Sequence, residues 1–574
     1  MTKSMLYAIV ASEQTIQQAI HEIHRVSGDG GEAGIAVVVD SSKKVLGVIT
    51  DGDIRWALCE NISLDRPVMD VASEDFCSVY SHLNKDEQLR MAMTQLRDNP
   101  KRMEIRLMKV VVVDREQSFV RFTNLFDLYR FGEQYHKTIA VYGMGFVGLT
   151  LALTLAEKSE MPVIGIDINS DVIRSLSQGT TLFYEKGLDS LLDFCLEKKR
   201  IQFVASEDGV PADIHILSVG TPVTADKQID FSFIDRAIEN IARVLKHGDM
   251  VILRSTVPTR TTRDRCLKAL EEKTNLKGGT DFYLVFAPER TIEGNALSEL
   301  KTLPQIIGGL TSDCVMRASS LFQRITPSVV KVDSLEIAEV IKLINNTYRD
   351  TVFGFANEVA LLCEQFNANA FDVIKAANDG YPRNPIPMPS PGVGGLCLDK
   401  DPHLYQISKG TELGFGRISR QINEEMVTSI AQKFINFTKT LMTPTRKAFI
   451  LGVAFKGYPE TSDIRFSTAL SLKDLLVKSG FEVHGFDYVA TSDDIEKSGI
   501  KFLQPPENFS AYDGCFVMNN NPNHIKLNIY KRLRTQDKPF FFFDGWNIYD
   551  KEDIESIQGI TYASLGYQSK AYGH

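Results

Sequence analysis

The segment from Ile139 to Asp167 constrains the fold more than any other part of this 574-residue chain. An apolar run leads into the glycine pattern Gly143-Met144-Gly145-Phe146-Val147-Gly148, and a helix-favouring stretch and a second apolar strand follow. Such glycines let the backbone approach a pyrophosphate at the helix N-terminus, so the unit predicts a doubly wound α/β domain that binds a dinucleotide. The predicted cofactor-binding residues here are Gly143, Gly145, Phe146, Val147, Gly148 and Asp167.

Asp167 also indicates which dinucleotide is bound. It stands at the end of the second strand, where its carboxylate can accept hydrogen bonds from a ribose 2′-hydroxyl. The same carboxylate repels the 2′-phosphate of NADP, so we expect NAD as the cofactor.

Composition excludes several classes of partner and site. The net charge of −9 gives no reason to expect nucleic acid or an anionic membrane as partner. Eight cysteines are scattered without C-x-x-C or His/Cys pairing, so we expect neither a disulfide framework nor a metal site, and a reduced cytoplasmic setting. No apolar run is long enough to span a membrane, and no export signal is evident.

The remaining patterns divide the chain into four predicted domains. Strands running into polar turns continue the first α/β domain over 137–330, and helical spacing from Leu335 to Asn378 predicts one long central helix. The Pro- and Gly-rich stretch from Asn378 to Asp401 is predicted to be irregular. The central region covers 331–441, and a second α/β lobe covers 442–574.

Residues 1–134 are predicted to form a separate α+β module. A helix over 15–26 and strands over 35–40 and 45–49 precede Thr50 and Asp53, and this pattern resembles a CBS (cystathionine-β-synthase) repeat. A weaker second copy follows, with Asn124 three residues before Asp127. The resemblance implies that Thr50 and Asp53 contact the ribose of a regulatory nucleotide, with an adenine nucleotide as the candidate; a structural or dimerising module without ligand is equally compatible.

Cys397 is the candidate nucleophile. It lies in the glycine-rich segment Pro391 to Pro402, where small neighbours leave a thiol approachable and Lys400 would favour the thiolate. The alternative is a buried structural cysteine, which is the more common case for a free thiol.

Ordered motifs connect this cysteine to a family. They are Val219-Gly220-Thr221-Pro222, Ser255-Thr256-Val257-Pro258, Pro288-Glu289-Arg290, Lys342 with Asn346, Gly394-Gly395-x-Cys397, and Ala454-Phe455-Lys456 followed by Asp463-Ile464-Arg465. Over about 137–570 the chain resembles the UDP-glucose/GDP-mannose dehydrogenase family. The resemblance implies two Rossmann-like lobes joined by a long central helix, in a homodimer or higher homo-oligomer.

The resemblance also implies a reaction and roles. The family oxidises the C6 hydroxyl of a nucleotide sugar to a carboxylate in two hydride transfers to NAD. Cys397 would carry a thiohemiacetal and then a thioester, with Lys342 and Asp401 in proton transfer and Asn346 at the oxyanion. Glu289 and Glu293 would act around the hydrolytic step, and Thr256 is a further implied catalytic residue. Further implied cofactor residues are Thr221, Thr256, Lys400 and Arg465, and implied substrate residues are Arg290, Lys342, Asn346, Arg383, Gly394 and Lys456.

The substrate and two other functions stay open. The motifs favour a UDP-N-acetylhexosamine, gluco or manno, for polysaccharide precursors. Leu396 and Lys400 depart from that branch, and Lys400-Asp401 and Glu293-Gly294 look more like a UDP-glucose enzyme. An inactive nucleotide-sensing protein and a two-electron hydroxyacid dehydrogenase are the alternatives. The intact Cys397, Lys342 and Asp401 argue against the first, and the second has no use for Cys397.

Overall fold

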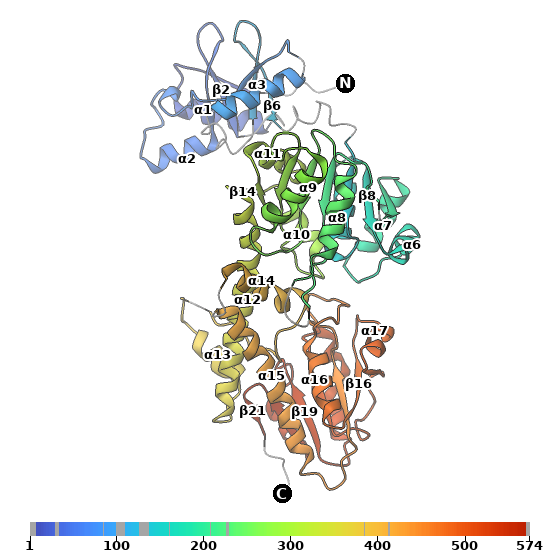
Figure 1. Cartoon of the computed structure of the whole chain (residues 1–574). Helices are drawn as coiled ribbons and strands as arrows, with labels where there is room; N and C mark the ends of the chain where they lie inside the picture. Colours follow the sequence, from blue (N-terminus) through green and yellow to red (C-terminus); the bar gives the residue numbers. More distant parts are fainter. Residues whose placement is uncertain are drawn as a thin grey trace. The chain divides into compact units, whose positions relative to one another are not determined.

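The computed structural model describes residues 7–28, 34–83, 85–98, 109–125, 137–159, 161–206, 208–224, 229–383, 385–410 and 414–569. The chain forms two compact units, Met1–Lys137 and Thr138–His574, which are described one at a time (Figure 1). Among the described helices, none is long and apolar enough to cross a membrane. No group of His, Cys, Asp or Glu in the same residues is arranged to hold a metal ion.

The first unit contains the same motif twice. In each copy the first strand is followed by a helix and pairs in parallel with the second strand. The second strand pairs antiparallel with the third strand, and the register shifts near the end of the second strand. The first copy is β1 Ala8–Ala11, α1 Ile16–Gly28, β2 Ile35–Val39, β3 Val45–Thr50 and α2 Asp51–Cys59, and the second is β4 Ser78–Tyr80, α3 Lys85–Asp98, β5 Lys109–Val113 and β6 Phe119–Asn124.

The hairpin turns of the two copies also agree in detail. Asp40 Oδ1 accepts hydrogen bonds from the amides of Ser42 and Lys44, at 2.8 and 2.9 Å. Asp114 makes the equivalent turn in the second copy. The unit therefore repeats one arrangement of strands, and its resemblance to CBS repeats stays a prediction. Asp127, expected in the second copy, lies outside the described residues.

The second unit begins with an eight-stranded sheet of order β14-β13-β12-β11-β10-β7-β8-β9, parallel except for the pair β12 and β13. Its first six strands in chain order are arranged as in doubly wound nucleotide-binding sheets. The strands are β7 Ile139–Tyr142, β8 Val163–Asp167, β9 Ile201–Ala205, β10 Ile214–Leu217, β11 Met250–Leu253, β12 Tyr283–Phe286, β13 Gln305–Gly309 and β14 Val329–Val332.

Helices cover both faces of this sheet, and apolar side chains fill the space between the layers. The helix after the glycine turn is buried over most of its length, as its all-round apolar sequence requires. The helices are α5 Phe146–Lys158, α6 Ser170–Ser177, α7 Leu188–Glu197, α8 Ser232–Ala242, α9 Lys268–Thr274, α10 Ala296–Thr302 and α11 Ser312–Phe322.

The central helices differ from the sequence prediction in two places. The expected single helix from Leu335 to Asn378 is two helices, α12 Leu335–Glu364 and α13 Ala370–Asn378, because the chain turns at Asn367 with a φ of 54°. The segment expected to stay irregular up to Asp401 becomes helical at Leu396, where α14 Leu396–Lys409 begins. A fourth helix, α15 Phe415–Thr438, packs along α12 (Figure 1).

The second lobe repeats the parallel topology, with order β17-β16-β15-β18-β19-β20-β21 and one antiparallel pair at the edge, β20 with β21. The strands are β15 Lys447–Leu451, β16 Glu482–Phe486, β17 Lys501–Phe502, β18 Gly514–Val517, β19 Phe540–Asp544, β20 Ile560–Ser564 and β21 Tyr567–Gln568; the helices are α16 Thr468–Lys478, α17 Ser492–Lys497, α18 Ile529–Arg534 and α19 Lys551–Glu555.

The two lobes differ at the acid that ends the second strand of each. Asp167 in the first lobe borders an open cavity. Asp487 in the second lobe is buried, and its carboxylate accepts hydrogen bonds from the amide of Val453 and from Asn519 Nδ2. The Asn519 side chain fills the space beside Gly452, so the dinucleotide crevice belongs to the first lobe.

Candidate active site

The glycine turn after β7 forms the floor of the cofactor crevice. Gly143 has a φ of 91°, and a Cβ there would lie 2.9 Å from the carbonyl oxygen of Ser218, so the position requires glycine. A Cβ at Gly148 would lie 1.8 Å from the Gly143 carbonyl oxygen. Gly145 differs from both, because nothing lies within 4 Å of its Cβ position; this is the open space that a pyrophosphate needs.

A cavity of about 250 Å³ continues from this turn along the edge of the sheet. Asp167 borders it, with one carboxylate oxygen accepting from the Met144 amide at 2.8 Å and the other from the Asn169 amide at 2.9 Å. Both oxygens keep a lone pair for ribose hydroxyls. Phe233 and Arg236 of α8 also line the cavity and were missed by the sequence analysis. The glycine turn, the acid and the cavity together fit NAD.

The predicted cofactor residues Thr221, Thr256 and Lys400 lie together. The Lys400 ammonium donates to Thr221 Oγ1 at 2.8 Å, and Thr221 Oγ1 donates to the carbonyl oxygen of Thr256 at 2.7 Å. This chain of contacts connects α14 to the loops that follow β10 and β11. Lys400 is therefore engaged with the cofactor-side loops.

Cys397 lies in the first turn of α14. The helix starts after Gly395, whose φ of 92° and contact with the Phe455 ring both require glycine. The Cys397 side chain is exposed to solvent, yet the surrounding protein atoms desolvate the thiolate and raise the pKa of the thiol. Lys342 opposes this rise more strongly than Lys400 does. Lys400 thus favours the thiolate as the sequence predicts, Lys342 does so more strongly, and the helix N-terminus acts in the same direction.

Buried polar groups of α12 and α14 meet beside this thiol. Lys342 and Asn346 are one turn apart on α12 and largely buried, and Asp401, one turn beyond Cys397, is fully buried. Asn346 Nδ2 donates to Asp401 Oδ2 at 2.6 Å. Asp401 Oδ1 is buried and finds no hydrogen-bond partner among the described residues, which leaves an acceptor for a water or a reacting group.

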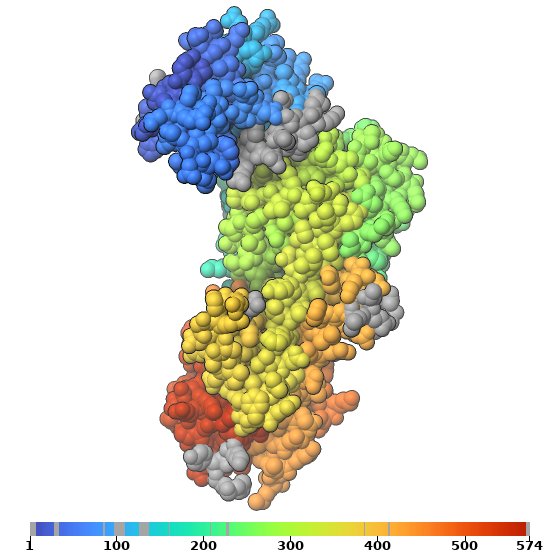
Figure 2. Space-filling view, turned by 90° about the vertical axis from the view of Figure 1, so that its left-hand side faces the viewer, coloured from blue at the N-terminus to red at the C-terminus, as the bar shows by residue number. Residues whose placement is uncertain are grey.

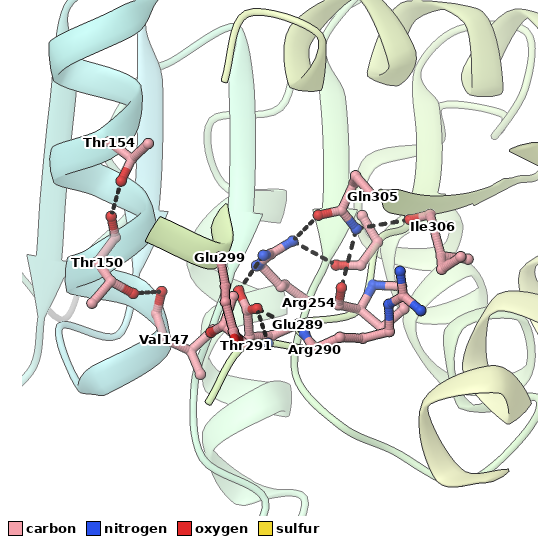
Figure 3. A network of polar contacts seen from close by, with 12 residues as sticks. Val147, Thr150, Thr154, Arg254, Glu289, Arg290, Thr291, Glu299, Gln305 and Ile306 are labelled. Carbon is pink, nitrogen blue, oxygen red and sulfur yellow. Dashed lines mark hydrogen bonds and ion pairs between the residues drawn. The ribbon is translucent and has the colours of Figure 1, made fainter. Parts of the chain in front are cut away.

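Glu289 is held in a buried network that Figure 3 shows. It forms an ion pair with Arg254, a fully buried residue at the end of β11, and its other oxygen accepts from the amides of Arg290 and Thr291 at 2.7 and 2.8 Å. Burial would raise the pKa of Glu289, but Arg254 and these amides hold it below its usual value. Both carboxylate oxygens of Glu289 therefore already have partners. The hydrolytic role of Glu289 stays a prediction, and these contacts do not favour it.

Arg254 was missed by the sequence analysis. Its guanidinium also donates to the Ala287 carbonyl at 3.1 Å. A further bond of 3.0 Å joins it to Gln305 Oε1, as Figure 3 shows. An arginine at the end of an apolar strand gives no signal of its own, because its partners lie on neighbouring strands.

Glu293 and Lys456 connect the two lobes. The Lys456 ammonium donates to the Glu293 carbonyl oxygen at 2.6 Å, and Thr461 Oγ1 donates to the Glu293 carboxylate at 3.0 Å. Burial, reinforced by the negative charge of Asp463, raises the pKa of Glu293 to about 7. Burial also lowers the pKa of Lys456 to about 8. Both groups are therefore able to exchange protons near neutral pH.

Three of the six predicted substrate residues line the same cavity. Arg290, Lys342, Asn346 and the unpredicted Asn345 and Arg349 line one cavity of about 360 Å³. Gly394 packs tightly against the Phe466 carbonyl, two residues before α14 begins. Arg383 is exposed next to the hydroxyl of Tyr381, and its substrate role stays a prediction.

Arg465, predicted as a cofactor residue, forms a two-point ion pair with Asp463. This pairing raises the pKa of Arg465, to which the Cys397 charge also contributes. Its cofactor role also stays a prediction.

The cofactor crevice and the thiol site form one arrangement. A dinucleotide crevice opens at the carboxyl ends of parallel strands, and a cysteine with a lysine, an amide and a carboxylate lies beside the loops that border it. This arrangement is that of an NAD-dependent dehydrogenase with a cysteine beside its cofactor crevice.

Comparison with known proteins places the chain within this class. It belongs to the UDP-glucose/GDP-mannose dehydrogenase family: the NAD-binding domain matches residues 137–326, the central domain 336–425 and the UDP-binding domain 449–551. The chain is an NAD-dependent nucleotide-sugar dehydrogenase. All three matched ranges lie within the second unit, apart from Lys137.

Similar proteins of known name agree with this placement. UDP-N-acetyl-D-mannosamine dehydrogenase of Pyrococcus horikoshii is 36% identical over 364 residues, 62% of this chain and 86% of that protein. The enzyme of the same name from Campylobacter jejuni is 32% identical over 61% of this chain and 84% of its own length. The solved Pyrococcus horikoshii structure matches with a TM-score of 0.66 at 30% identity, covering 75% of this chain and 99% of that one.

Proposed function

We propose that the protein oxidises the C6 hydroxyl of a UDP-N-acetylhexosamine, foremost UDP-N-acetyl-D-mannosamine, to the uronic acid for polysaccharide precursor synthesis. The observation that carries the reaction type is the placement of Cys397 beside Lys342, Asn346 and Asp401. The substrate assignment rests on the similar proteins, several of which are named for that sugar.

The overall reaction removes four electrons. The alcohol, two NAD⁺ and one water become the carboxylate, two NADH and three protons. When bound, NAD supplies the hydride acceptor in the crevice of Gly143, Gly145 and Asp167. The remaining steps belong to side chains of the chain itself.

Cys397 attacks the aldehyde produced by the first oxidation and forms a C–S bond, giving a thiohemiacetal. The second oxidation turns this adduct into a thioester, and water then breaks the C–S bond to release the carboxylate. The buried ammonium of Lys342 and the amide of Asn346 stabilise the oxygen that becomes negative at these stages. Asp401 Oδ1, which has no partner in the described part of the chain, is the acceptor for the proton of the attacking water.

Local positive charge supports an anionic substrate. The chain as a whole carries a charge of −9, yet Arg290, Lys342 and Arg349 line one cavity next to the catalytic groups. Their charges offset the negative field of the protein at this point, which favours a nucleotide sugar over an uncharged alcohol.

The test is NADH formation with a panel of UDP-sugars that includes UDP-N-acetyl-D-mannosamine, UDP-N-acetylglucosamine and UDP-glucose. Two NADH per sugar acid with an N-acetylhexosamine support the proposal. Highest kcat/KM with UDP-glucose would favour the UDP-glucose 6-dehydrogenase alternative instead. No NADH with any UDP-sugar would favour the inactive sensing protein.

We also propose that two copies associate through α12. Tyr348 is 67% exposed and Phe355 51% exposed on this helix, and Ile344 and Leu362 are exposed as well. Figure 2 shows the surface of α12 and α13 uncovered on one face. Exposed apolar side chains of this kind usually mark an interface. Light scattering after Tyr348→Glu tests this proposal: a monomer is the expected result, and an unchanged mass would contradict it.

For the first unit we propose a CBS-like module that binds a regulatory nucleotide. Its two copies of one motif support the resemblance. Thr50 and Asp53 are partners of each other, because they form a reciprocal N-terminal cap on α2, with Thr50 Oγ1 donating to Asp53 Oδ2 at 2.7 Å. A ligand would have to share these groups with the cap.

Titration of the full chain with adenine nucleotides tests the module. Binding that Asp53→Asn weakens supports nucleotide sensing. The control for lost capping is Thr311→Ala, which removes a side-chain cap from the N-terminus of α11 in the second unit and should leave nucleotide binding by the first unit unchanged. No binding of any adenine nucleotide would favour a purely structural module.

A further inference from the structure

A buried ion pair contacts the segment 390–395, which leads into α14 and is called here the Cys397 loop. Asp350 on α12 is fully buried, and its carboxylate pairs with Arg420 on α15, with Arg420 Nε 3.0 Å from Asp350 Oδ2. Asn423, almost one turn after Arg420, donates to Asp350 Oδ1 at 3.1 Å. These contacts therefore hold one turn of α15 against one turn of α12.

The same group of residues reaches the loop at two points. Arg420 Nη1 donates to the carbonyl oxygen of Val393 at 3.0 Å. The Ser390 amide donates to Asn357 Oδ1 at 2.9 Å, and Asn357 Nδ2 in turn donates to Asn423 Oδ1 at 2.8 Å. The backbone that leads into α14 is therefore bound to side chains that are themselves held by α12 and α15.

Arg420 also contacts the catalytic helix. Its Nη1 lies 3.7 Å from Asp399 Oδ1, two residues after Cys397. The other partner of the ion pair, Asp350, lies one turn after Asn346 on α12. Asn346 in turn donates a hydrogen bond to Asp401 of α14. The position of the thiol relative to Lys342 and Asn346 thus depends on two connections between α12 and α14, one direct and one through Arg420.

We propose that Arg420, held by Asp350, is a positioning residue that sets the place of Cys397 relative to the groups on α12. The inference rests on the proposed function of Cys397. A planar guanidinium is suited to this role, because it bonds a carboxylate at two points and still offers a donor to a backbone carbonyl. A lysine ammonium keeps the charge and loses that geometry.

Carbamidomethylation of the two exposed cysteines by iodoacetamide tests the proposal without turnover. Cys397 and Cys59 are exposed and the other six cysteines are buried, so Cys59 serves as the reference thiol in peptide mass spectrometry. In Arg420→Lys we expect the rate ratio of Cys397 to Cys59 to change about threefold or more. We expect kcat to fall on the order of tenfold and the KM for NAD to change less than about twofold.

Glu364→Gln is the matched control. Glu364 on α12 pairs with Lys433 on α15 at 2.7 Å, so it belongs to the same two helices but lies away from the loop. We expect it to lower thermal stability without changing the thiol ratio or kcat. Asp399→Asn, at the exposed end of the group, is the second variant, and a smaller change of the thiol ratio is expected.

Unchanged thiol ratios and kcat in both Arg420→Lys and Asp399→Asn would overturn the proposal. A change in the thiol ratio in Glu364→Gln equal to that in Arg420→Lys would also overturn it, because any weakening of the helix pair would then suffice. Failure of the proposed function itself shows elsewhere: Cys397→Ser would retain full carboxylate formation.

Discussion

Asn346 donates to one oxygen of Asp401 at 2.6 Å, and the other oxygen of Asp401 is buried without a hydrogen-bond partner among the described residues. A buried acceptor without a partner costs free energy, so a native protein that retains one at such a site usually uses it. The thiol of Cys397 lies one helical turn away on α14, so the free oxygen is well placed for the hydrolytic step.

Asp401→Asn should separate oxidation from hydrolysis. The amide keeps the shape of the side chain but cannot take a proton from water, so the thioester should accumulate. We expect a burst of up to two NADH per site followed by turnover slower by about 10²-fold or more. Stopped-flow fluorescence measures the burst, and mass spectrometry detects the adduct on Cys397. No burst and no adduct would place Asp401 before thioester formation.

Cys397→Ser should stop carboxylate formation. A serine hydroxyl at the same place is a far weaker nucleophile toward the aldehyde at neutral pH. Product analysis by chromatography with a UDP-N-acetylhexosamine checks this, and Cys59→Ser in the first unit is the matched exposed-cysteine control. Full carboxylate yield in Cys397→Ser would exclude covalent catalysis at this thiol. One NADH per substrate without carboxylate, unchanged by Cys397→Ser, would favour the two-electron hydroxyacid dehydrogenase.

Gly145→Val should weaken cofactor binding without unfolding the protein. A Cβ at Gly145 would have no atom within 4 Å beyond its chain neighbours, so the added side chain begins in the space left for the pyrophosphate. We expect the affinity for NADH to fall at least about tenfold, or ~1.4 kcal/mol, in fluorescence titration. UDP binding and the melting temperature should stay near wild type. Unchanged NADH affinity would contradict the assignment of this turn.

Glu293→Gln should change how stability depends on pH. Burial raises the pKa of Glu293 from 4.5 to about 7, so the folded protein binds a proton that the unfolded chain has already released in this range. The contribution of Glu293 to stability is therefore fully present below pH 4.5 and is lost as the pH rises through about 7. Glutamine does not titrate, so the variant lacks this loss of stability. The melting temperature of Glu293→Gln minus that of wild type should therefore rise by about 2–4 °C as the pH goes from about 5.5 to 8.5.

Glu425→Gln, an exposed carboxylate on α15, serves as the control for that experiment. Calorimetry at several pH values gives the melting temperatures of both variants. A constant difference between Glu293→Gln and wild type across the range would show that Glu293 has an ordinary pKa in the folded protein.

Arg254→Met should destabilise the protein by about 3–5 kcal/mol, because it leaves the buried carboxylate of Glu289 without its ion pair. Adding Glu289→Gln to it should restore much of that stability. If Glu289 only positions its loop, kcat should recover together with stability in the double variant. Urea unfolding and NADH assays measure the two. Recovered stability with kcat still lost would restore the hydrolytic role of Glu289.

Local patterns were sufficient for part of the site. The glycine turn, Asp167 and the spacing of Lys342 and Asn346 all depend on residues close in sequence, and the structure places them as expected. The glycine-rich segment singled out Cys397, whereas the family motifs supplied Lys342, Asn346 and Asp401. The start of α14 was wrong by about one turn and a half, because Gly394 and Gly395 hide a helix N-terminus in a segment that resembles a loop.

Contacts between distant segments account for what the sequence did not reveal. Arg254, which follows β11, forms an ion pair with Glu289, which follows the neighbouring strand β12. Arg420 forms an ion pair with Asp350, 70 residues earlier in the chain. A charged residue inside an apolar pattern looks like a surface residue until its partner is known. The stronger influence of Lys342 over Lys400 on the thiol also depends on how α12 and α14 pack.

Residues along α12 bind separate parts of the molecule. Near its start, Glu339 accepts a hydrogen bond from Thr262, where the helical segment after β11 begins. Further along, Asn357 accepts one from Ser390 of the Cys397 loop. At 1.5 Å per residue these contacts span about 27 Å of one rigid helix. Inserting or deleting one residue between them would turn every later side chain by about 100° away from its partner. Evolution can therefore change residues along this stretch one by one, but its length should stay fixed among relatives that remain active.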